Sequence, residues 1–547
     1  MSMRYSVKGF FKVSINYFFR IFTKENSSSI PEPELVFKGP QSDCLLTIKV
    51  EEEVLFKKLN DINVGKCQGP DELHGKLLYE IRSELVKPLT NLFNLSLESS
   101  TVPQDWRDAI VSPLFKKGSR AKAENYRPVS LTSIVGKLCE SIIKDRLVQH
   151  LNEHELLRNS QRGFTSGRSC LTNLLDFFES ASKELDSGND VDLVYLDFCK
   201  AFDKVPHCRL IKKLHAHGIR GKVLEWIKSW LSGRRQRVCV DGSLSEWVEV
   251  LSGVPQGSVL GPVLFLIYIN DLDQGLVSKL GKFADDSKLC KAISGQQDVS
   301  ALQCDLTQLE RWAEKWQMKF NEEKCVVMHL GKNNAKSQYS LGNIVLKSSE
   351  RERDLGIIVD KTMKFSEQVN SAVGKANATL GMIKRNITCK NRNIVTRLYK
   401  ALVRPKLEYC VQAWRPYLRK DIDKMERVQH RATKMIEGCK SLSYEDRLKA
   451  TGLMTLEDRR KRGDMIEVFK FLKDINKTDS GQWLHLANNV RTRGHRLKLV
   501  KNRSRLDIRK NFFSQRVVND WNSLPEVVVE AESINSFKNR YDKFVSG

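Results

Sequence analysis

Phe283-Ala284-Asp285-Asp286 is the stretch around which the rest of the sequence is organised, because it sets two adjacent carboxylates between two short apolar runs. Like charges this close repel each other and raise one pKa, so the pair is costly unless a cation lies beside it. Carboxylate oxygens suit Mg2+, which also binds substrate phosphates. An isolated Asp-Asp pair, however, is more often a surface turn than a metal site. The neighbouring motifs decide between these two interpretations.

Composition indicates a large folded protein with a polyanionic partner. The chain has 547 residues, 41% hydrophobic and 29% charged, which fits about three or four folded units. A formal charge of +25 points to nucleic acid through counterion release, with a membrane surface or mere solubility as the alternatives. The 13 cysteines form no C-x-x-C pair, so we interpret them as reduced thiols of an intracellular protein.

A second acid follows a buried-type strand. Residues 191–196 are largely apolar, and the run ends in Asp197, a costly position for a carboxylate. Asp197 would be a metal ligand if this strand lay beside the hairpin that carries Asp285 and Asp286. Phe202 then lies one turn further along, next to the same site.

Two basic loops come earlier in the chain. Lys116 and Lys117 end a short strand, and Arg127 follows in Asn125-Tyr126-Arg127-Pro128. Such side chains can hold a triphosphate, Arg bidentately and Lys as a point charge, although solvated surface charge is the alternative. The second loop runs from Gln161-Arg162-Gly163-Phe164 to Ser169 and opens a helix at about 171–185. It is either an anion site or a simple helix cap.

The loop Gly253-Val254-Pro255-Gln256-Gly257 is sparse in side chains. Its glycines let the backbone approach a ligand, and the Gln256 amide can bond a base or sugar. The alternative is a turn before a core helix at 259–272. Further on, a turn at 320–323 presents Lys324 before another strand.

The remaining segments carry weaker signals. Apolar spacing predicts a helix through Leu73 and Leu85, capped by Asp71 and kinked at Pro88, and a single strand at 354–359. From 361 onward the pattern is helical and basic, with dense positive runs at 459–462 and 491–510. Its aromatic residues are core or stacking candidates: Trp414, Tyr417, Phe512, Phe513 and Trp521. Residues 1–25 are basic and aromatic, which suggests a linker remnant or a transit peptide.

The ordered set of motifs resembles the reverse transcriptases of non-LTR (LINE-type) retrotransposons, most closely the jockey and chicken-repeat group. The similarity runs from about residue 50 to the C-terminus, and Cys199 and Cys325 stand where Ser and Thr are commoner. The resemblance implies an α+β right-hand polymerase, with fingers, a palm with an antiparallel sheet, and a helical thumb, followed by a mainly helical basic region. The expected limits are 1–50 for a linker remnant, 51–190 for an extension and fingers, 191–360 for the palm, and 361–547 for the thumb and C-terminal region. The whole reverse transcriptase domain is expected at about 95–360.

The resemblance also implies roles for individual residues. Asp197, Asp285 and Asp286 match the catalytic acids and would bind two Mg2+ ions, for which Mn2+ could substitute. Phe202 matches the position that excludes a 2′-hydroxyl, and Lys324 matches a lysine that protonates pyrophosphate. The remaining nucleotide-binding positions are Lys116 or Lys117, Arg127, Gln256 and Gly257.

The implied function is an RNA-directed DNA polymerase acting on an RNA template, a DNA primer and dNTPs. No upstream endonuclease, zinc knuckle or ribonuclease H-like acid set is recognised, so an endonuclease supplied in trans is expected. We expect no membrane partner, and a location in the nucleus and cytoplasm, or in mitochondria if residues 1–25 direct import. A catalytically silent nucleic-acid-binding protein and an organelle-targeted maturase-like enzyme are the alternatives.

Overall fold

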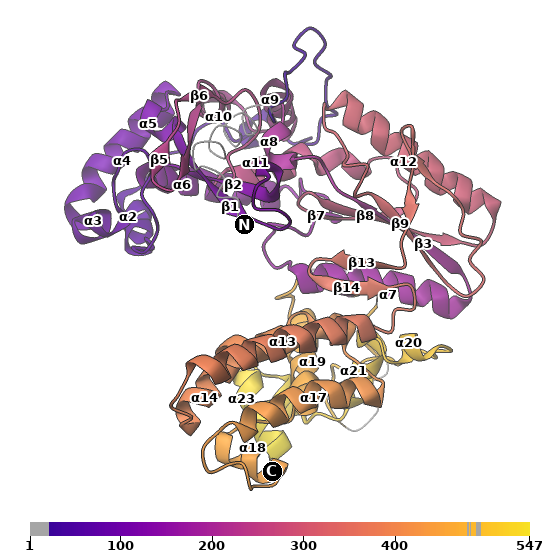
Figure 1. Cartoon of the computed structure of the whole chain (residues 1–547). Helices are drawn as coiled ribbons and strands as arrows, with labels where there is room; N and C mark the ends of the chain where they lie inside the picture. The colour runs from indigo at the N-terminus through magenta and orange to yellow at the C-terminus, as the bar shows by residue number, and fades with distance from the viewer. Residues whose placement is uncertain (1–20, 478–480, 482, 488–493, 547) are drawn as a thin grey trace, which may run out of the picture.

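The computed structural model describes residues 21–477, 481, 483–487 and 494–546 (Figure 1). Most of the 1–25 segment, and the start of the basic run at 491–510, therefore lie outside the described residues. No helix in the described ranges combines the length and apolarity needed to cross a lipid bilayer.

A five-stranded sheet forms the centre of the molecule. Its order is β12 (Lys347–Ser348), β9 (Val326–Leu330), β3 (Asp190–Leu196), β8 (Asp286–Ile293) and β7 (Lys279–Phe283). β3 pairs antiparallel with both β8 and β9, so its apolar residues are buried on both faces. The α+β class expected from the sequence is confirmed.

Helices cover both faces of this sheet. Val191 and Leu193 pack into the core cluster that includes α7 (Cys170–Ser187). Val194 and Leu196 point the opposite way, as alternation along a strand requires, into the cluster of α11 (Gly261–Tyr268) and α12 (Gln296–Lys315). The short 3-10 helix η3 (Asn270–Asp273) follows α11, so the predicted helix at 259–272 is divided in two.

A second sheet lies toward the N-terminus. It joins β2 (Tyr126–Leu131), β1 (Ala109–Phe115), β4 (Arg235–Val240) and β5 (Ser243–Leu244), and β6 (Val248–Glu249) also pairs with β4. The helices around it are η1 (Gln41–Asp43), α2 (Glu52–Asn60), α3 (Gly75–Glu80), α4 (Arg82–Ser99), α5 (Gln104–Arg107), η2 (Ala123–Asn125) and α6 (Ile134–Glu153). Three helices follow β3 and precede β4 in the sequence: α8 (Ala201–Lys204), α9 (His207–Ala216) and α10 (Gly221–Leu231).

Three local predictions are wrong. The predicted helix with a kink at Pro88 is two helices that divide at Ile81, and α4 continues through Pro88. The cap of α3 is His74, whose ring accepts a hydrogen bond from the Lys76 amide, and not Asp71. The predicted single strand at 354–359 is the hairpin β13 (Arg351–Asp354) and β14 (Ile357–Asp360), which follows the small hairpin β10 (Ser340–Leu341) and β11 (Ile344–Val345).

The C-terminal part is helical, and α7 and the β13–β14 hairpin lie between it and the central sheet (Figure 1). Its elements are α13 (Ser366–Asn386), α14 (Arg392–Leu398), the π-helix η4 (Tyr399–Val403), α15 (Arg404–Glu408), α16 (Val411–Trp414), α17 (Arg419–Lys434), α18 (Tyr444–Thr451), α19 (Leu456–Leu472), α20 (Asp507–Lys510), α21 (Phe513–Asn522), α22 (Glu526–Val529) and α23 (Ile534–Ser546). Trp414, Phe512, Phe513 and Trp521 are buried, which favours the core interpretation of these aromatics. Arg509 ties this part to α7 through a buried ion pair of 2.6 Å with Glu179.

Candidate active site

Strand pairing brings the two acidic motifs together. In the antiparallel register of β3 and β8, Leu196 lies opposite Ser287, so Asp197 follows at the level of Asp286. Asp285 lies in the adjoining turn, because Phe283 of β7 pairs with Asp286 of β8 and leaves only Ala284 and Asp285 between them. Three acids from two distant segments therefore gather at one end of the sheet.

The Gln161–Phe164 loop holds this turn in shape. Ala284 has a φ of +55°, a strained conformation for a residue with a side chain. The Gln161 Oε1 atom accepts hydrogen bonds from the amides of Ala284 (3.1 Å) and Gly163 (2.9 Å). A Cβ on Gly163 would lie 2.5 Å from the Ala284 nitrogen, so only glycine permits this approach.

The same loop leads into α7. Ser169 caps that helix through a reciprocal pair of bonds with Thr172, and Arg168 donates to the carbonyl oxygens of Gln161 and Asn159. This confirms the helix-cap interpretation of the loop. The support that Gln161 gives to the acidic turn was not foreseen, although the residue stood in a motif that the sequence singled out.

Asp197 is held by the segment that carries Lys324. The Asn321 amide donates to the Asp197 carbonyl oxygen at 2.7 Å, and the Lys324 amide donates to the Asn321 carbonyl oxygen at 2.9 Å. The Lys324 ammonium forms an ion pair with the Asp197 carboxylate and is about half exposed. Lys324 thus lies beside the acids, as the motif order predicted.

The three carboxylates influence one another electrostatically. Burial, together with the charges of Asp285, Asp197 and Asp354, raises the pKa of Asp286 to about 6. Burial also raises the pKa of Asp285, with Asp197 adding to the rise and Arg127 and Lys116 opposing it. The Asp286 side chain still reaches solvent, so a cation could approach it.

Reverse transcriptases as a family use divalent metal ions. Within the described part of the chain, no three Asp, Glu, His or Cys side chains lie close enough to hold an ion as they stand. One of the three carboxylates, Asp197, is instead paired with the Lys324 ammonium. The oxygen donors and the raised pKa of Asp285 and Asp286 nevertheless fit a divalent cation, which would relieve their repulsion.

We expect this site to make stability depend on pH in the metal-free protein. Because the folded-state pKa of Asp286 is about 6, against an ordinary value of 3.8, the cost of its charge is complete above pH 6 and disappears toward pH 4. Mg2+ requires the ionised form, so the rise in melting temperature on adding Mg2+ should be larger at pH 7.5 than at pH 5.5. Thermal melts of the wild type and of Asp286→Asn at both pH values measure this. An unchanged pH dependence in the variant would contradict the assignment.

The predicted triphosphate ligands lie on the β1–β2 pair. Arg127 faces Leu114 across that pair, and the Lys116 amide donates to the Asn125 carbonyl oxygen at 2.8 Å. Burial lowers the pKa of Lys116, and the charges of Lys324 and Arg127 lower it further, while Asp197 acts in the opposite sense. Lys116 and Arg127 therefore share the space around the acids, and the charge interactions of Lys116 with Asp197 and Asp285 favour it over Lys117 as the ligand.

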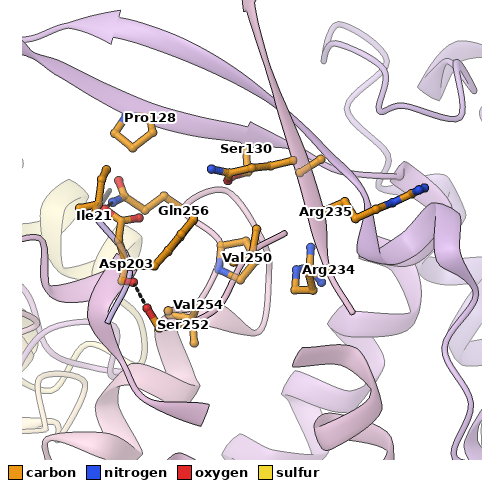
Figure 2. A pocket seen from close by; sticks show the side chains of 15 residues that line it. Ile21, Pro128, Ser130, Asp203, Arg234, Arg235, Val250, Ser252, Val254 and Gln256 are labelled. Atoms are coloured by element: carbon orange, nitrogen blue, oxygen red, sulfur yellow. Dashed lines mark hydrogen bonds between the residues drawn. The ribbon is translucent and has the colours of Figure 1, made fainter. Parts of the chain in front are cut away.

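Phe202 lies next to the loop that carries Gln256 and Gly257. The Phe202 ring stacks on Phe265 with centroids 4.5 Å apart, and its carbonyl oxygen accepts from the Val254 amide at 2.7 Å. Gly257 has a φ of +120°, and a Cβ there would lie 2.5 Å from the Ser130 carbonyl oxygen. Gln256 lines a pocket with Asp203, Arg234 and Ile21 (Figure 2).

Two charged residues near the acids were missed by the sequence analysis. Lys288 on β8 forms a 2.6 Å ion pair with Asp354, and both side chains are only 6% exposed. Asp354 in turn acts on the pKa of Asp286. The sequence around Lys288 does not indicate that its partner is Asp354, which lies 66 residues away.

The chain places an acid-bearing strand next to an acid-bearing hairpin, with a basic strand pair facing them and a helical part following. This is the arrangement expected of a right-hand nucleic-acid polymerase. Residues 115–365 match the family model described as reverse transcriptase (RNA-dependent DNA polymerase). This segment of the chain is therefore similar to reverse transcriptases.

Curated relatives specify the group. The chain is 26% identical over 399 residues to the probable RNA-directed DNA polymerase from transposon X-element of Drosophila melanogaster, covering 71% of this chain and 43% of the relative. It is 27% identical over 415 residues to the probable RNA-directed DNA polymerase from transposon BS of the same organism, covering 72% and 45%. It is 26% identical over 388 residues to the RNA-directed DNA polymerase from mobile element jockey, also of Drosophila melanogaster, covering 68% and 42%. These matches confirm the resemblance to non-LTR retrotransposon reverse transcriptases.

The chain spans less than half the length of these relatives. Among solved structures, apo telomerase from Candida tropicalis, truncated from its C-terminal domain, aligns with 53% of this chain and 59% of that chain. The TM-score is 0.33 at 12% identity. That likeness is loose, and the polymerase assignment depends instead on the strand pairings and the family match.

Proposed function

We propose that this chain is an RNA-directed DNA polymerase that extends a primer 3′-hydroxyl with dNTPs on an RNA template. The observation that carries the proposal is the register of β3 and β8, which sets Asp197 at the level of Asp286 and beside Asp285. Acids from two distant segments have no structural need to meet at one end of a sheet, where their mutual repulsion opposes folding. Two cations bound between the acids would offset this repulsion and so explain the arrangement.

Asp197, Asp285 and Asp286 would hold two Mg2+ ions, or Mn2+ in their place. When bound, the ions supply Lewis-acid stabilisation of the attacking and leaving oxygens. The chain itself provides alignment: Gln161 fixes the turn of Asp285, and Asn321 fixes the end of β3. Fixed groups of this kind need no reorganisation as charge moves during the reaction.

The basic residues have distinct tasks in this scheme. Lys116 and Arg127, with Lys117 nearby, would hold the triphosphate, whose negative charge compensates their mutual repulsion. Lys324 would release Asp197 when a cation binds, and its ammonium would then be free to protonate the departing pyrophosphate. Gln256 and Gly257 would contact the base or sugar of the incoming nucleotide.

We expect Phe202→Ala to admit ribonucleotides. The Phe202 ring is held by stacking on Phe265 and by an edge contact with Phe164 at 6.5 Å, so its position is fixed. Removing it should raise incorporation of rNTPs relative to dNTPs by about tenfold or more, as for other steric pockets. Single-nucleotide incorporation with matched dNTP and rNTP measures this ratio. An unchanged ratio would remove the sugar-selecting role.

The domain limits also belong to the proposal. We place the fingers and their extension at 51–190, the palm at 191–360, and the thumb and basic helical region at 361–547, with a linker at 1–50. For nicking of a DNA target we propose an endonuclease outside these 547 residues, either elsewhere in a longer polyprotein or supplied in trans. The nucleus and cytoplasm are the proposed locations.

Primer extension on an RNA template with a DNA primer, Mg2+ and four dNTPs tests the function. We expect full-length products, and Mn2+ should support the reaction as well. Salt-dependent binding of the template with no incorporation under either metal would favour a catalytically silent nucleic-acid-binding protein instead.

A further inference from the structure

The loop that carries Gln256 is built directly on the α8 segment. A Cβ on Gly253, which has a φ of +89°, would lie 2.6 Å from the Asp203 carbonyl oxygen. The Ser252 hydroxyl donates to that same oxygen at 2.8 Å, a bond drawn in Figure 2, and the Gly253 amide donates to the Val205 carbonyl oxygen at 2.8 Å. The loop backbone therefore cannot move without moving Asp203.

The Gln256 backbone is fixed from its other side. Its carbonyl oxygen accepts from the Ser130 amide of β2 at 2.7 Å, so the loop is held between α8 and the β1–β2 pair. What the backbone leaves undetermined is the orientation of the side-chain amide, because its NH2 and carbonyl ends have nearly the same shape. A polar neighbour must select one of the two.

Asp203 is that neighbour. The Gln256 Nε2 atom donates to Asp203 Oδ2 at 3.1 Å, and the two side chains lie at one wall of the pocket in Figure 2. An ionised carboxylate only accepts hydrogen bonds, so it can pair with the NH2 end and never with the carbonyl end of the amide. Burial, partly offset by Lys200 and the Gln256 bond, raises the pKa of Asp203 to about 6, so the group is ionised at pH 8.

We propose that Asp203 is a positioning residue that fixes the Gln256 amide with its carbonyl oxygen directed toward the incoming nucleotide. The amide then offers the substrate an acceptor, which suits a hydroxyl or amino donor of the sugar or base. This inference rests on the proposed polymerase function, because it takes the nucleotide as the ligand of Gln256. It assigns a role to Asp203 that the sequence motif alone did not supply.

The variants Asp203→Ala, Asp203→Asn, Gln256→Ala and the double alanine variant test this in single-nucleotide incorporation at pH 8. Asp203→Ala should raise the KM for dNTP about tenfold, the usual effect of leaving a polar group misaligned, and should change kcat by less than about threefold. Asp203→Asn should raise the KM as well, although less than Asp203→Ala, because an asparagine amide can pair with either end of the Gln256 amide and no longer selects one orientation. The double variant should match Gln256→Ala, since Asp203 acts only through Gln256.

Ser252→Ala serves as the control for loop displacement, because it removes a bond to the Asp203 backbone and leaves the carboxylate in place. An unchanged KM in Asp203→Ala, additive losses in the double variant, or an equal rise in Ser252→Ala would each overturn the inference. The polymerase proposal is judged separately, by whether the wild type extends a primer. If it does not, dNTP binding by the same variants decides: the same pattern of Kd supports the inference, and absence of dNTP binding overturns it.

Discussion

Asp285→Asn should lower primer extension by about 10^3-fold or more while leaving RNA binding almost unchanged. The substitution keeps the size of the side chain but removes a charge from the group of acids that includes Asp197 and Asp286. Losing one such electrostatic contact to a transition state typically costs that much in rate. Template affinity depends instead on basic side chains elsewhere on the chain, so it should persist. Extension assays and filter binding on the same preparations measure the two quantities.

Asp241→Asn is the matched control. Asp241 is an exposed acid in the β4–β5 turn, and its φ of +48° is one that asparagine adopts readily. This variant should extend primers at the wild-type rate. Retained extension in Asp285→Asn, or equal losses in both variants, would mean that the acidic turn is not the catalytic centre.

Lys288→Met should lower the free energy of unfolding by about 3–5 kcal/mol. It leaves the buried Asp354 carboxylate without its 2.6 Å partner, and an unpaired buried charge costs about this much. The ammonium also lies 4.3 Å from the centroid of the Phe177 ring, so packing against α7 changes as well. Urea unfolding followed by circular dichroism measures the difference.

Lys291→Met provides the comparison on the same strand. Its ion pair with Asp298 is longer, at 3.5 Å, and more exposed, so this change should cost less than about 1 kcal/mol. The double variant Lys288→Met/Asp354→Leu should recover most of the lost stability, because it removes the unpaired charge. Equal losses in the two lysine variants would argue against a special buried pair.

Much of the candidate site could be predicted from the sequence because its signals are local. The acidic turn followed from two adjacent carboxylates between apolar runs, and the end of β3 followed from an acid closing an apolar run. What the sequence could not supply was the register that sets Leu196 opposite Ser287, because pairing between distant strands is decided by the packing of both faces. The support that Gln161 gives to Ala284 is equally non-local.

The wrong prediction of a single strand at 354–359 has a physical cause. The β13–β14 hairpin turns at Leu355 and Gly356, both with positive φ, and leucine is not a residue from which such a turn is predicted.

Three residues of the basic run at 459–462 form ion pairs with acids far away in the sequence. Arg459 pairs with Glu408, Lys461 with Asp520 and Arg462 with Asp542. Its charge therefore stabilises the helical part rather than presenting a free basic surface.

Titration of Mn2+ by electron paramagnetic resonance tests most directly whether the acids form one metal centre. The wild type should bind Mn2+, and Asp197→Asn and Asp286→Asn should each weaken the same binding site. The double variant Asp197→Asn/Asp286→Asn should bind Mn2+ only slightly less tightly than the single variant with the lower affinity, as expected for two groups that bind the same ion. Undiminished Mn2+ binding by Asp197→Asn, or loss of a different site in each variant, would contradict the account.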